Sequence, residues 1–405
     1  MEQTEDLKNA ETAIALCAVG AEKAVSNELR KMGLAVAGSG FGRVRFRADI
    51  AGIYRALIGL RAADRVLLEA GFFHAEDFDA LFEGTKAVHW ERLIPKGMGL
   101  VVTKVRSNRS QLKAETSIQA LVHKAAAERL CKQYGLARLA EGGKTAEIRV
   151  YVEKDEVSLL LDASGEPLFK RGYRSEGGAA PLRETTAASL LLLSGWKRKF
   201  PLYDPFCGSG TILIEALMYA WDMAPGLGRR FAIEDTLVAD SKIEKNLREE
   251  LRGRIDFART IRIAGSDEDA RSVSIARSNI ERAFDLAQGR APVRGIRPAA
   301  SRSGGPVLPE LKALPASAAR SAASDAGFIV TNPPYGRRLG DTAEAERLYS
   351  EMAAMMTRFP GWKLAVITDH PGFESFFGKK ADSCREISNG AVPSCFFQYE
   401  RFAAK

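Results

Sequence analysis

The sequence predicts an α/β fold in which a parallel, doubly wound sheet follows an N-terminal α+β region. Two observations support this prediction. In the second half of the chain, short apolar runs typical of buried strands alternate regularly with helical patterns, which is the signature of a parallel sheet. The first half instead mixes helical patterns with alternating strands and a hairpin. A chain of 405 residues is long enough for two or three domains.

The composition excludes several classes of protein. Hydrophobic residues make up 46% and charged residues 27%, which excludes a disordered chain. No apolar run is long enough to span a membrane, and the run 13–21 lacks the basic start of a signal peptide. The five cysteines and four histidines form no metal-ligand pattern. We therefore expect a soluble cytoplasmic protein with no metal site, and its net charge of +8 fits a polyanionic partner.

The first elements predict a small α+β module. A short apolar strand over 12–19 precedes a helix over 21–32, which ends where Gly33 can terminate it. An alternating strand over 42–47 and a helix over 50–60 repeat this order.

Basic residues mark the next region. The run from Leu100 predicts a buried strand leading into a basic loop, and 117–133 predicts an amphipathic helix that also carries basic residues. The runs 146–152 and 156–162, separated by a charged turn, predict a hairpin.

The second half begins after a glycine- and arginine-rich linker over 169–181. An apolar helix over 182–194 is expected first. The elements that follow are expected to be strand 202–206, helix 211–219, strand 261–266, helix 270–287, strand 327–331, helix 343–359 and strand 363–368. The interruption at 290–320 is rich in basic, proline and small residues and is interpreted as a mobile basic loop.

The clearest motif is LYDPFCGSGTILIEA, residues 202–216, in which a strand ends in a small-residue loop that opens a helix. Ligands of doubly wound sheets bind at the carboxyl ends of the strands, and glycines there let a ligand approach the backbone. The loop lacks the GK[ST] of a phosphate-binding P-loop and the third glycine of a dinucleotide fingerprint. We expect it to hold a nucleotide-like cofactor, although a simple tight turn would also explain the glycines.

The second motif, GSDED, follows the next predicted strand. An acidic residue at this place can accept hydrogen bonds from both ribose hydroxyls of a nucleoside, and Asp267 is the candidate. The alternative role is capping of the next helix, for which Asp269 is better placed.

The third motif, GFIVTNPPYG, brings Asn332, Pro333, Pro334 and Tyr335 to the same edge of the sheet. The exocyclic amine of a base is a poor nucleophile because its lone pair is delocalised into the ring. The side-chain oxygen of Asn332 and the carbonyl of Pro333 can accept its two hydrogens and orient the nitrogen toward an electrophilic methyl group. Both prolines stiffen the turn without adding donors, and Tyr335 offers a ring on which an extruded base can stack. The plain alternative is a turn.

Together DPFCGSGT, GSDED and NPPYG resemble the motifs of class I S-adenosylmethionine-dependent methyltransferases, which have a Rossmann-like fold. The run 155–231, with DEVSLLLDASGEPLFKRGYR, APLRET and MAPGLGRRF, resembles the bacterial 23S rRNA guanine-N(2) methyltransferases that carry an N-terminal THUMP domain. The resemblance implies a ferredoxin-like module at 1–60, a THUMP RNA-binding domain at 61–165, a linker at 166–180 and a methyltransferase domain at 181–405.

The resemblance also implies roles for individual residues. Those expected to bind S-adenosylmethionine are Asp204, Phe206, Cys207, Gly208, Ser209, Gly210 and Thr211 of the loop, with Asp267 at the ribose, Thr185 and Asn332. Asn332, Pro333, Pro334 and Tyr335 would be catalytic. The family usually places an acidic residue after the third strand, at the cofactor adenine, and 293–301 offers none.

The expected reaction is methyl transfer to the exocyclic amine of a guanine in structured RNA, with 23S rRNA the favoured substrate and tRNA an alternative. An adenine N(6) DNA methyltransferase would use NPPY equally well, but the THUMP-like region argues against it. A non-catalytic RNA-binding protein with a vestigial methyltransferase fold is the remaining alternative, and the intact motifs argue against it.

Overall fold

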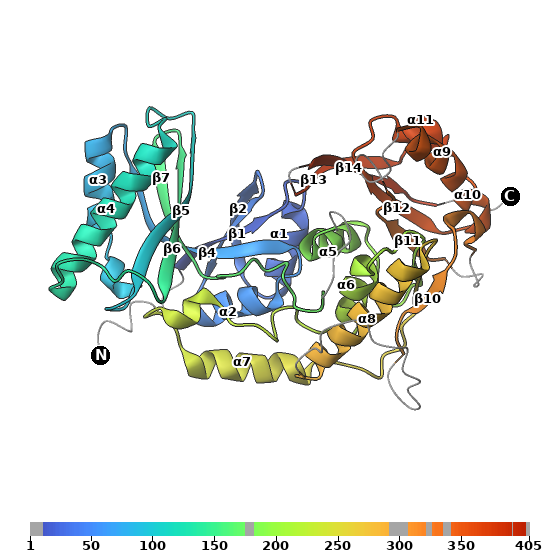
Figure 1. The fold of residues 1–405 in the computed structure, drawn as a ribbon, viewed down its shortest axis with the longest axis horizontal. Coiled ribbons are helices and arrows are strands. Elements are labelled where there is room, and N and C mark those ends of the chain that lie inside the picture. The colour runs from blue at the N-terminus through green and yellow to red at the C-terminus, as the bar shows by residue number, and fades with distance from the viewer. Residues whose placement is uncertain are drawn as a thin grey trace.

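The computed structural model describes residues 11–174, 182–290, 307–320, 326–334, 342–390 and 392–401. Within these ranges the strands form two sheets of seven strands each, and helices pack against both (Figure 1). No helix in the described ranges is long and apolar enough to cross a membrane.

The first sheet has the order β2-β3-β1-β4-β7-β6-β5. Its strands are β1 (Glu11–Cys17), β2 (Ala35–Gly40), β3 (Arg43–Ala48), β4 (Ala63–His74), β5 (Gly99–Asn108), β6 (Thr145–Glu153) and β7 (Glu156–Asp162). The helices of this region are α1 (Glu22–Lys31), α2 (Ile50–Gly59), α3 (Phe78–Ala87), the 3-10 turn η3 (Trp90–Arg92) and α4 (Glu115–Tyr134). The predicted hairpin is present, since β6 and β7 pair antiparallel.

The sequence did not predict β2, β4 or α3. Strand β4 pairs with β1 on one side and with β7 on the other, so a single sheet continues across residues 60 and 61. The division into a ferredoxin-like module and a THUMP domain at this point therefore stays a prediction, and it would have to separate two neighbouring strands.

The second sheet has the order β10-β9-β8-β11-β12-β14-β13. Its strands are β8 (Leu202–Asp204), β9 (Ile263–Asp267), β10 (Glu310–Ala313), β11 (Phe328–Thr331), β12 (Lys363–Thr368), β13 (Ser383–Asn389) and β14 (Val392–Tyr399). The first five strands of that order are parallel, and β14 and β13 run antiparallel at one edge. The helical elements are α5 (Glu184–Leu193), α6 (Thr211–Ala220), η4 (Ala232–Asp235), α7 (Ser241–Gly253), α8 (Ala270–Ala287), η5 (Ala316–Ala318), α9 (Thr342–Met352), α10 (Met355–Arg358) and α11 (Phe373–Phe377).

Helices cover both faces of the second sheet, which confirms the doubly wound prediction. Successive side chains of a strand point to opposite faces. Val330 and Ala365 accordingly join the core that contains α5, α6 and α8. Ile329 and Leu364 join a separate core with α9, α10 and α11.

Two expectations for this half need correction. The interpretation of 290–320 as a loop is wrong for 310–313, because β10 pairs in parallel with β9 at the sheet edge. Only Leu311 of this strand is buried, so the segment lacks the apolar run that would have identified it. The single helix expected over 343–359 is divided into α9 and α10.

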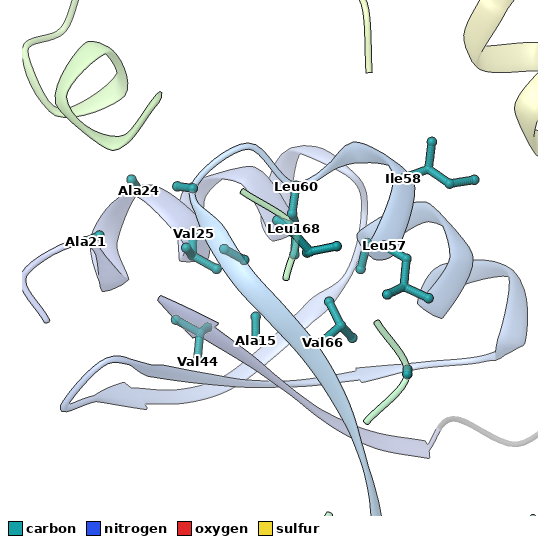
Figure 2. Close-up of a cluster of buried hydrophobic side chains, with 14 of the residues drawn as sticks. Ala15, Ala21, Ala24, Val25, Val44, Leu57, Ile58, Leu60, Val66 and Leu168 are labelled. Atoms are coloured by element: carbon teal, nitrogen blue, oxygen red, sulfur yellow. The ribbon is translucent and has the colours of Figure 1, made fainter. Parts of the chain in front are cut away.

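Several side chains in the described part of the predicted linker are buried, although Glu166, Lys170 and Gly172 are exposed. Leu168 and Tyr173 are each 1% exposed, and Arg171 is 6% exposed. Figure 2 shows Leu168 beside Leu60, in the layer above the strand that carries Val66. These residues therefore join both halves of the protein in one continuous core and do not form an exposed tether.

Candidate active site

Three polar side chains predicted from the motifs lie at the carboxyl ends of adjacent parallel strands. Asp204 is the last residue of β8, Asp267 is the last residue of β9, and Asn332 directly follows β11. Because β8 lies between β9 and β11, the chain brings these residues to one edge of the sheet.

The loop between β8 and α6 has a conformation that requires glycine at two positions. Gly208 and Gly210 have φ angles of +50° and +83°. A Cβ on Gly210 would lie 3.0 Å from the Cβ of Ala276 in α8, so the loop packs closely on that helix. Gly210 also begins α6 without a side-chain cap, which leaves backbone N–H groups at the helix start available to a ligand.

Asp204 is buried and joins the first motif to the third. Its Oδ1 accepts hydrogen bonds from the Thr331 hydroxyl at 2.6 Å and from the Phe206 N–H at 3.1 Å. Burial raises the pKa of this carboxyl to about 7, and the charge of Asp267 adds to the rise while the two hydrogen bonds oppose it. A carboxyl that titrates near neutrality is typical of functional sites.

The raised pKa of Asp204 predicts a pH dependence of stability. The folded protein binds this proton more tightly than the unfolded chain between the ordinary pKa of 3.8 and about 7. The free energy of unfolding should therefore fall as the pH rises through that range, by about 1.4 kcal/mol per pH unit at most. Asp204→Asn should remove this part of the slope in urea unfolding without cofactor, whereas exposed Asp79→Asn should keep it. An unchanged slope in Asp204→Asn would show that this carboxyl is not the titrating group.

Asp267 joins the second motif to the glycine loop. Its Oδ2 accepts from the Gly208 N–H at 2.9 Å, and its Oδ1 accepts from the Asp269 N–H at 3.0 Å. The side chain is only partly buried, so lone pairs on both oxygens remain for a ligand. Asp269 caps α8 by accepting from the N–H groups of Arg271 and Ser272, which is the role that the sequence indicated for it.

Asn332 has a buried hydrogen-bond acceptor to which no described residue donates. Its Oδ1 is inaccessible to solvent and has no hydrogen-bond partner among the residues that the structure describes. Such an atom costs about 1–3 kcal/mol, which suggests that its partner arrives with a ligand. Pro333 is buried and Pro334 is partly buried beside it. Tyr335 lies outside the described residues, so its stacking role stays a prediction.

Thr185 is the predicted site residue whose described hydrogen bonds lead away from this group, so its place in the cofactor site stays a prediction. Its hydroxyl donates to Asp64, at the start of β4, and its carbonyl accepts from Ser189. Among the described contacts, none connects its side chain with the loop, Asp267 or Asn332. These bonds give Thr185 a role in joining the two halves of the protein.

Residues that the sequence did not indicate hold the β8–α6 loop in place. The Asn279 side chain in α8 donates to the Ser209 carbonyl at 2.9 Å, and Arg174 donates to the Thr211 hydroxyl at 3.0 Å. The Tyr203 hydroxyl donates to Ser266 at 2.7 Å. Helix periodicity could have placed Asn279 near the loop, but no local pattern identifies its partner.

In chain order, β10 is the third strand of the parallel sheet. An acidic residue that contacts the adenine of the cofactor would therefore be expected after Ala313. The described residues 314–320 contain no aspartate or glutamate. The departure from the family pattern at the adenine therefore stays a prediction. Within the described ranges, no cluster of His, Cys, Asp or Glu could hold a metal ion.

These residues fit a nucleoside cofactor with a positively charged tail. The glycine loop allows close approach, Asp267 offers carboxylate oxygens for two hydroxyls, and the buried carboxyl of Asp204 would ionise more readily beside a cation. The unpartnered Asn332 oxygen adds an acceptor at the same edge.

Comparison with known proteins agrees with this arrangement. Residues 171–287 and 290–396 match the model of the RMKL-like methyltransferase domain, and residues 12–67 match that of the RlmL ferredoxin-like domain. The chain is 34% identical to the Bacillus subtilis protein named "Putative RNA methyltransferase YpsC", over 96% of this chain and 95% of that protein.

The chain is also 32% identical to the Ribosomal RNA large subunit methyltransferase K/L of Syntrophotalea carbinolica, over 92% of this chain. It spans only about half, 51%, of that relative's length.

Solved structures show the same fold over nearly the whole chain. SMU.472, described as "a putative methyltransferase complexed with SAH", has a TM-score of 0.85 and 33% identity, and the match covers 98% of this chain and 100% of that one. A Listeria monocytogenes protein described as a predicted N6-adenine-specific DNA methylase has a TM-score of 0.84 and 35% identity and covers 96% of each chain. SAH is what S-adenosylmethionine becomes after giving up its methyl group. On this evidence the chain belongs to the RMKL-like family of class I, S-adenosylmethionine-dependent methyltransferases.

Proposed function

We propose that the protein transfers a methyl group to the exocyclic N2 amine of a guanine in RNA, with 23S rRNA as the substrate. The observation that carries this proposal is the buried, unpartnered Oδ1 of Asn332 at the cofactor edge of the sheet. An exocyclic amine would supply the hydrogen that this oxygen lacks, because such an amine has two hydrogens to donate.

The residues of the chain orient the nucleophile in this mechanism. S-adenosylmethionine supplies the electrophilic methyl group. Asn332 Oδ1 and the Pro333 carbonyl would accept the two amine hydrogens and point the nitrogen lone pair at that methyl group. On transfer the N–C bond would form as the S–C bond breaks, and the nitrogen, made cationic by methylation, would lose a proton to water. No general base is needed before the attack. Tyr335 would stack on the extruded base.

RNA as the substrate is supported by three features. The names of the relatives refer to RNA or ribosomal RNA methylation. The net charge of +8 favours a polyanionic partner. Lys104 and Arg106 lie exposed on β5, and Lys113, Lys124 and Lys132 are exposed in the segment that follows, so the region expected to be a THUMP domain presents basic residues to solvent.

A second candidate is methylation of the adenine N6 amine in DNA. The name of the Listeria structure favours it, and Asn332 would orient that amine in the same way. The proposal is tested by incubating the protein with labelled S-adenosylmethionine and either RNA or DNA from cells that lack it, then digesting and identifying the labelled nucleoside. We expect N2-methylguanosine in 23S rRNA, whereas N6-methyldeoxyadenosine would overturn the proposal.

Substitution of Asp267 should weaken cofactor binding, whereas substitution of the neighbouring Asp269 should lower only stability. Asp267→Ala removes a charged acceptor, and at about 1.5–3 kcal/mol for such a hydrogen bond the affinity for S-adenosylmethionine should fall roughly 10- to 100-fold. Asp269→Ala is the matched control, since it removes only a helix cap and should lower stability by about 1 kcal/mol with little change in affinity. Titration calorimetry and urea unfolding measure the two effects. Equal affinity in Asp267→Ala and the parent would remove Asp267 from the site.

A further inference from the structure

A cavity of about 650 Å³ lies where α1 and α2 of the first half meet the second half. It is separate from the candidate active site. Lys197 and Lys199 in its wall precede β8, whereas the active site lies beyond the other end of that strand. Tyr219 and Asp222 line it at the carboxyl end of α6, a ten-residue helix that places them about 15 Å from the glycine loop.

The wall of this cavity is strongly basic. Seven of its fifteen lining residues are lysine or arginine and only two are acidic. Both acidic side chains are already engaged. Glu28 accepts from the N–H groups of Arg61 and Ala62, each at 3.0 Å, and Asp222 pairs with Arg198 at 2.8 Å. Lys31, Lys197 and Lys199 are exposed, and none of them forms an ion pair with any residue that the structure describes. The cavity therefore has an excess of positive charge.

The guanidinium of Arg61 lies in this wall, and one of its nitrogens has no hydrogen-bond acceptor among the described residues. The residue is 7% exposed, and its Nη2 donates to the Met223 carbonyl at 2.6 Å. Its Nη1 is buried and has no acceptor within the described part of the chain, and the same holds for Nε of Arg198. Both guanidinium groups lie over the ring of Tyr219, at 5.5 Å and 4.5 Å from its centroid. An anion in the cavity would supply the acceptors that these donors lack.

A smaller cavity of about 380 Å³ extends this basic surface. It shares Glu28, Lys31 and Leu192 with the first cavity and adds Lys23 and Arg385. Adjoining cavities with basic walls suit a ligand that carries more than one anionic group.

We propose that the cavity lined by Arg61, Arg198, Lys31, Lys197 and Lys199 is a binding site for phosphate groups. Arginine guanidinium groups match phosphate oxygens in geometry, and the flexible lysines add charge at the mouth. The phosphates belong either to the backbone of the RNA substrate, held at a distance from the target base, or to a free phosphorylated compound. The proposal goes beyond methyl transfer, because it concerns a site at the opposite end of α6.

Calorimetric titration of the full-length protein with inorganic tripolyphosphate tests this site. The test variant is Lys197→Gln combined with Lys199→Gln, since both side chains are exposed and form no ion pair with a described residue, so their loss should not affect folding. The control is Lys242→Gln combined with Lys245→Gln, which removes the same charge from exposed positions of α7 outside the cavity. We expect the test variant to bind tripolyphosphate about tenfold or more weakly than the parent and the control to match the parent.

RNA affinity, measured at several salt concentrations, distinguishes the two sources of phosphate. If RNA backbone enters the cavity, the test variant binds 23S rRNA more weakly, and the slope of log affinity against log salt becomes shallower by about 0.7–0.9 per lysine removed. If a free phosphorylated compound is the ligand, only tripolyphosphate binding falls. Parent-like tripolyphosphate binding by the test variant, or an equal loss in the control, would overturn the proposal. Calorimetry detects the anion without methyl transfer, so failure of the proposed reaction would be seen separately.

Discussion

Asn332→Ala should lower the rate of methyl transfer by about two to three orders of magnitude, the scale of a single lost electrostatic contact in a transition state. The alanine variant cannot accept a hydrogen from the target amine, so the nitrogen is no longer aligned with the methyl group. Single-turnover rates at saturating S-adenosylmethionine measure this effect, and separate titrations should show cofactor affinity within about threefold of the parent, because the substitution leaves Asp267, the residue proposed to bind the ribose, untouched.

The same substitution should leave the protein as stable as the parent or more stable. Alanine removes a buried acceptor that has no partner in the described structure, and such an atom costs about 1–3 kcal/mol in the free protein. Asn246→Ala, at an exposed position of α7, is the matched control and should change neither rate nor stability. A parent-like rate in Asn332→Ala would refute the amine-orienting mechanism. A large fall in melting temperature would instead indicate a structural role for Asn332.

Local motifs were enough to predict that Asp204, Asp267 and Asn332 come to one edge of the sheet, the candidate active site. A strand that ends in DPFCGSG, GSD or TNPP needs only the rule that parallel strands end at one edge of a sheet to bring Asp204, Asp267 and Asn332 together. The hydrogen bonds from Thr331 to Asp204 and from Gly208 to Asp267 show how closely the three motifs meet. What no motif could show is that burial raises the pKa of Asp204 to about 7.

The elements that the sequence missed depend on partners far along the chain. Strand β4 carries both charged and apolar residues and becomes a strand because β1 and β7 flank it. Edge strand β10 has one buried residue and is fixed by β9. The run 169–181 is rich in glycine and arginine, which indicated a linker. The burial of its residues Arg171 and Tyr173 follows from contacts with residues more than 40 positions away, such as Arg61 and Glu215.

Arg171 shows how strongly that segment joins the two halves. Its guanidinium donates to the carbonyls of Leu168 at 2.6 Å and Arg61 at 2.5 Å, and its Nε lies 3.5 Å from Glu215 in α6. The side chains of Arg171 and Glu215 are 2% and 0% exposed. The Tyr173 hydroxyl also donates to Glu215, at 3.1 Å, while Glu215 Oε2 has no partner among the described residues. A buried carboxylate with so few donors depends on the charge of its arginine.

Arg171→Met should therefore lower the free energy of unfolding by about 3–5 kcal/mol, because it leaves the buried Glu215 carboxylate without its ion-pair partner. Adding Glu215→Met should recover a large part of that loss, since the double variant removes both charges of the pair and keeps the side-chain volume. Arg252→Met, exposed on α7, should stay within about 0.5 kcal/mol of the parent. Urea unfolding followed by far-UV circular dichroism measures all three, and the halves should unfold in a single transition because they share a core. Equal losses in the single and double variants would show that the carbonyl hydrogen bonds of Arg171, and not its charge, hold the halves together.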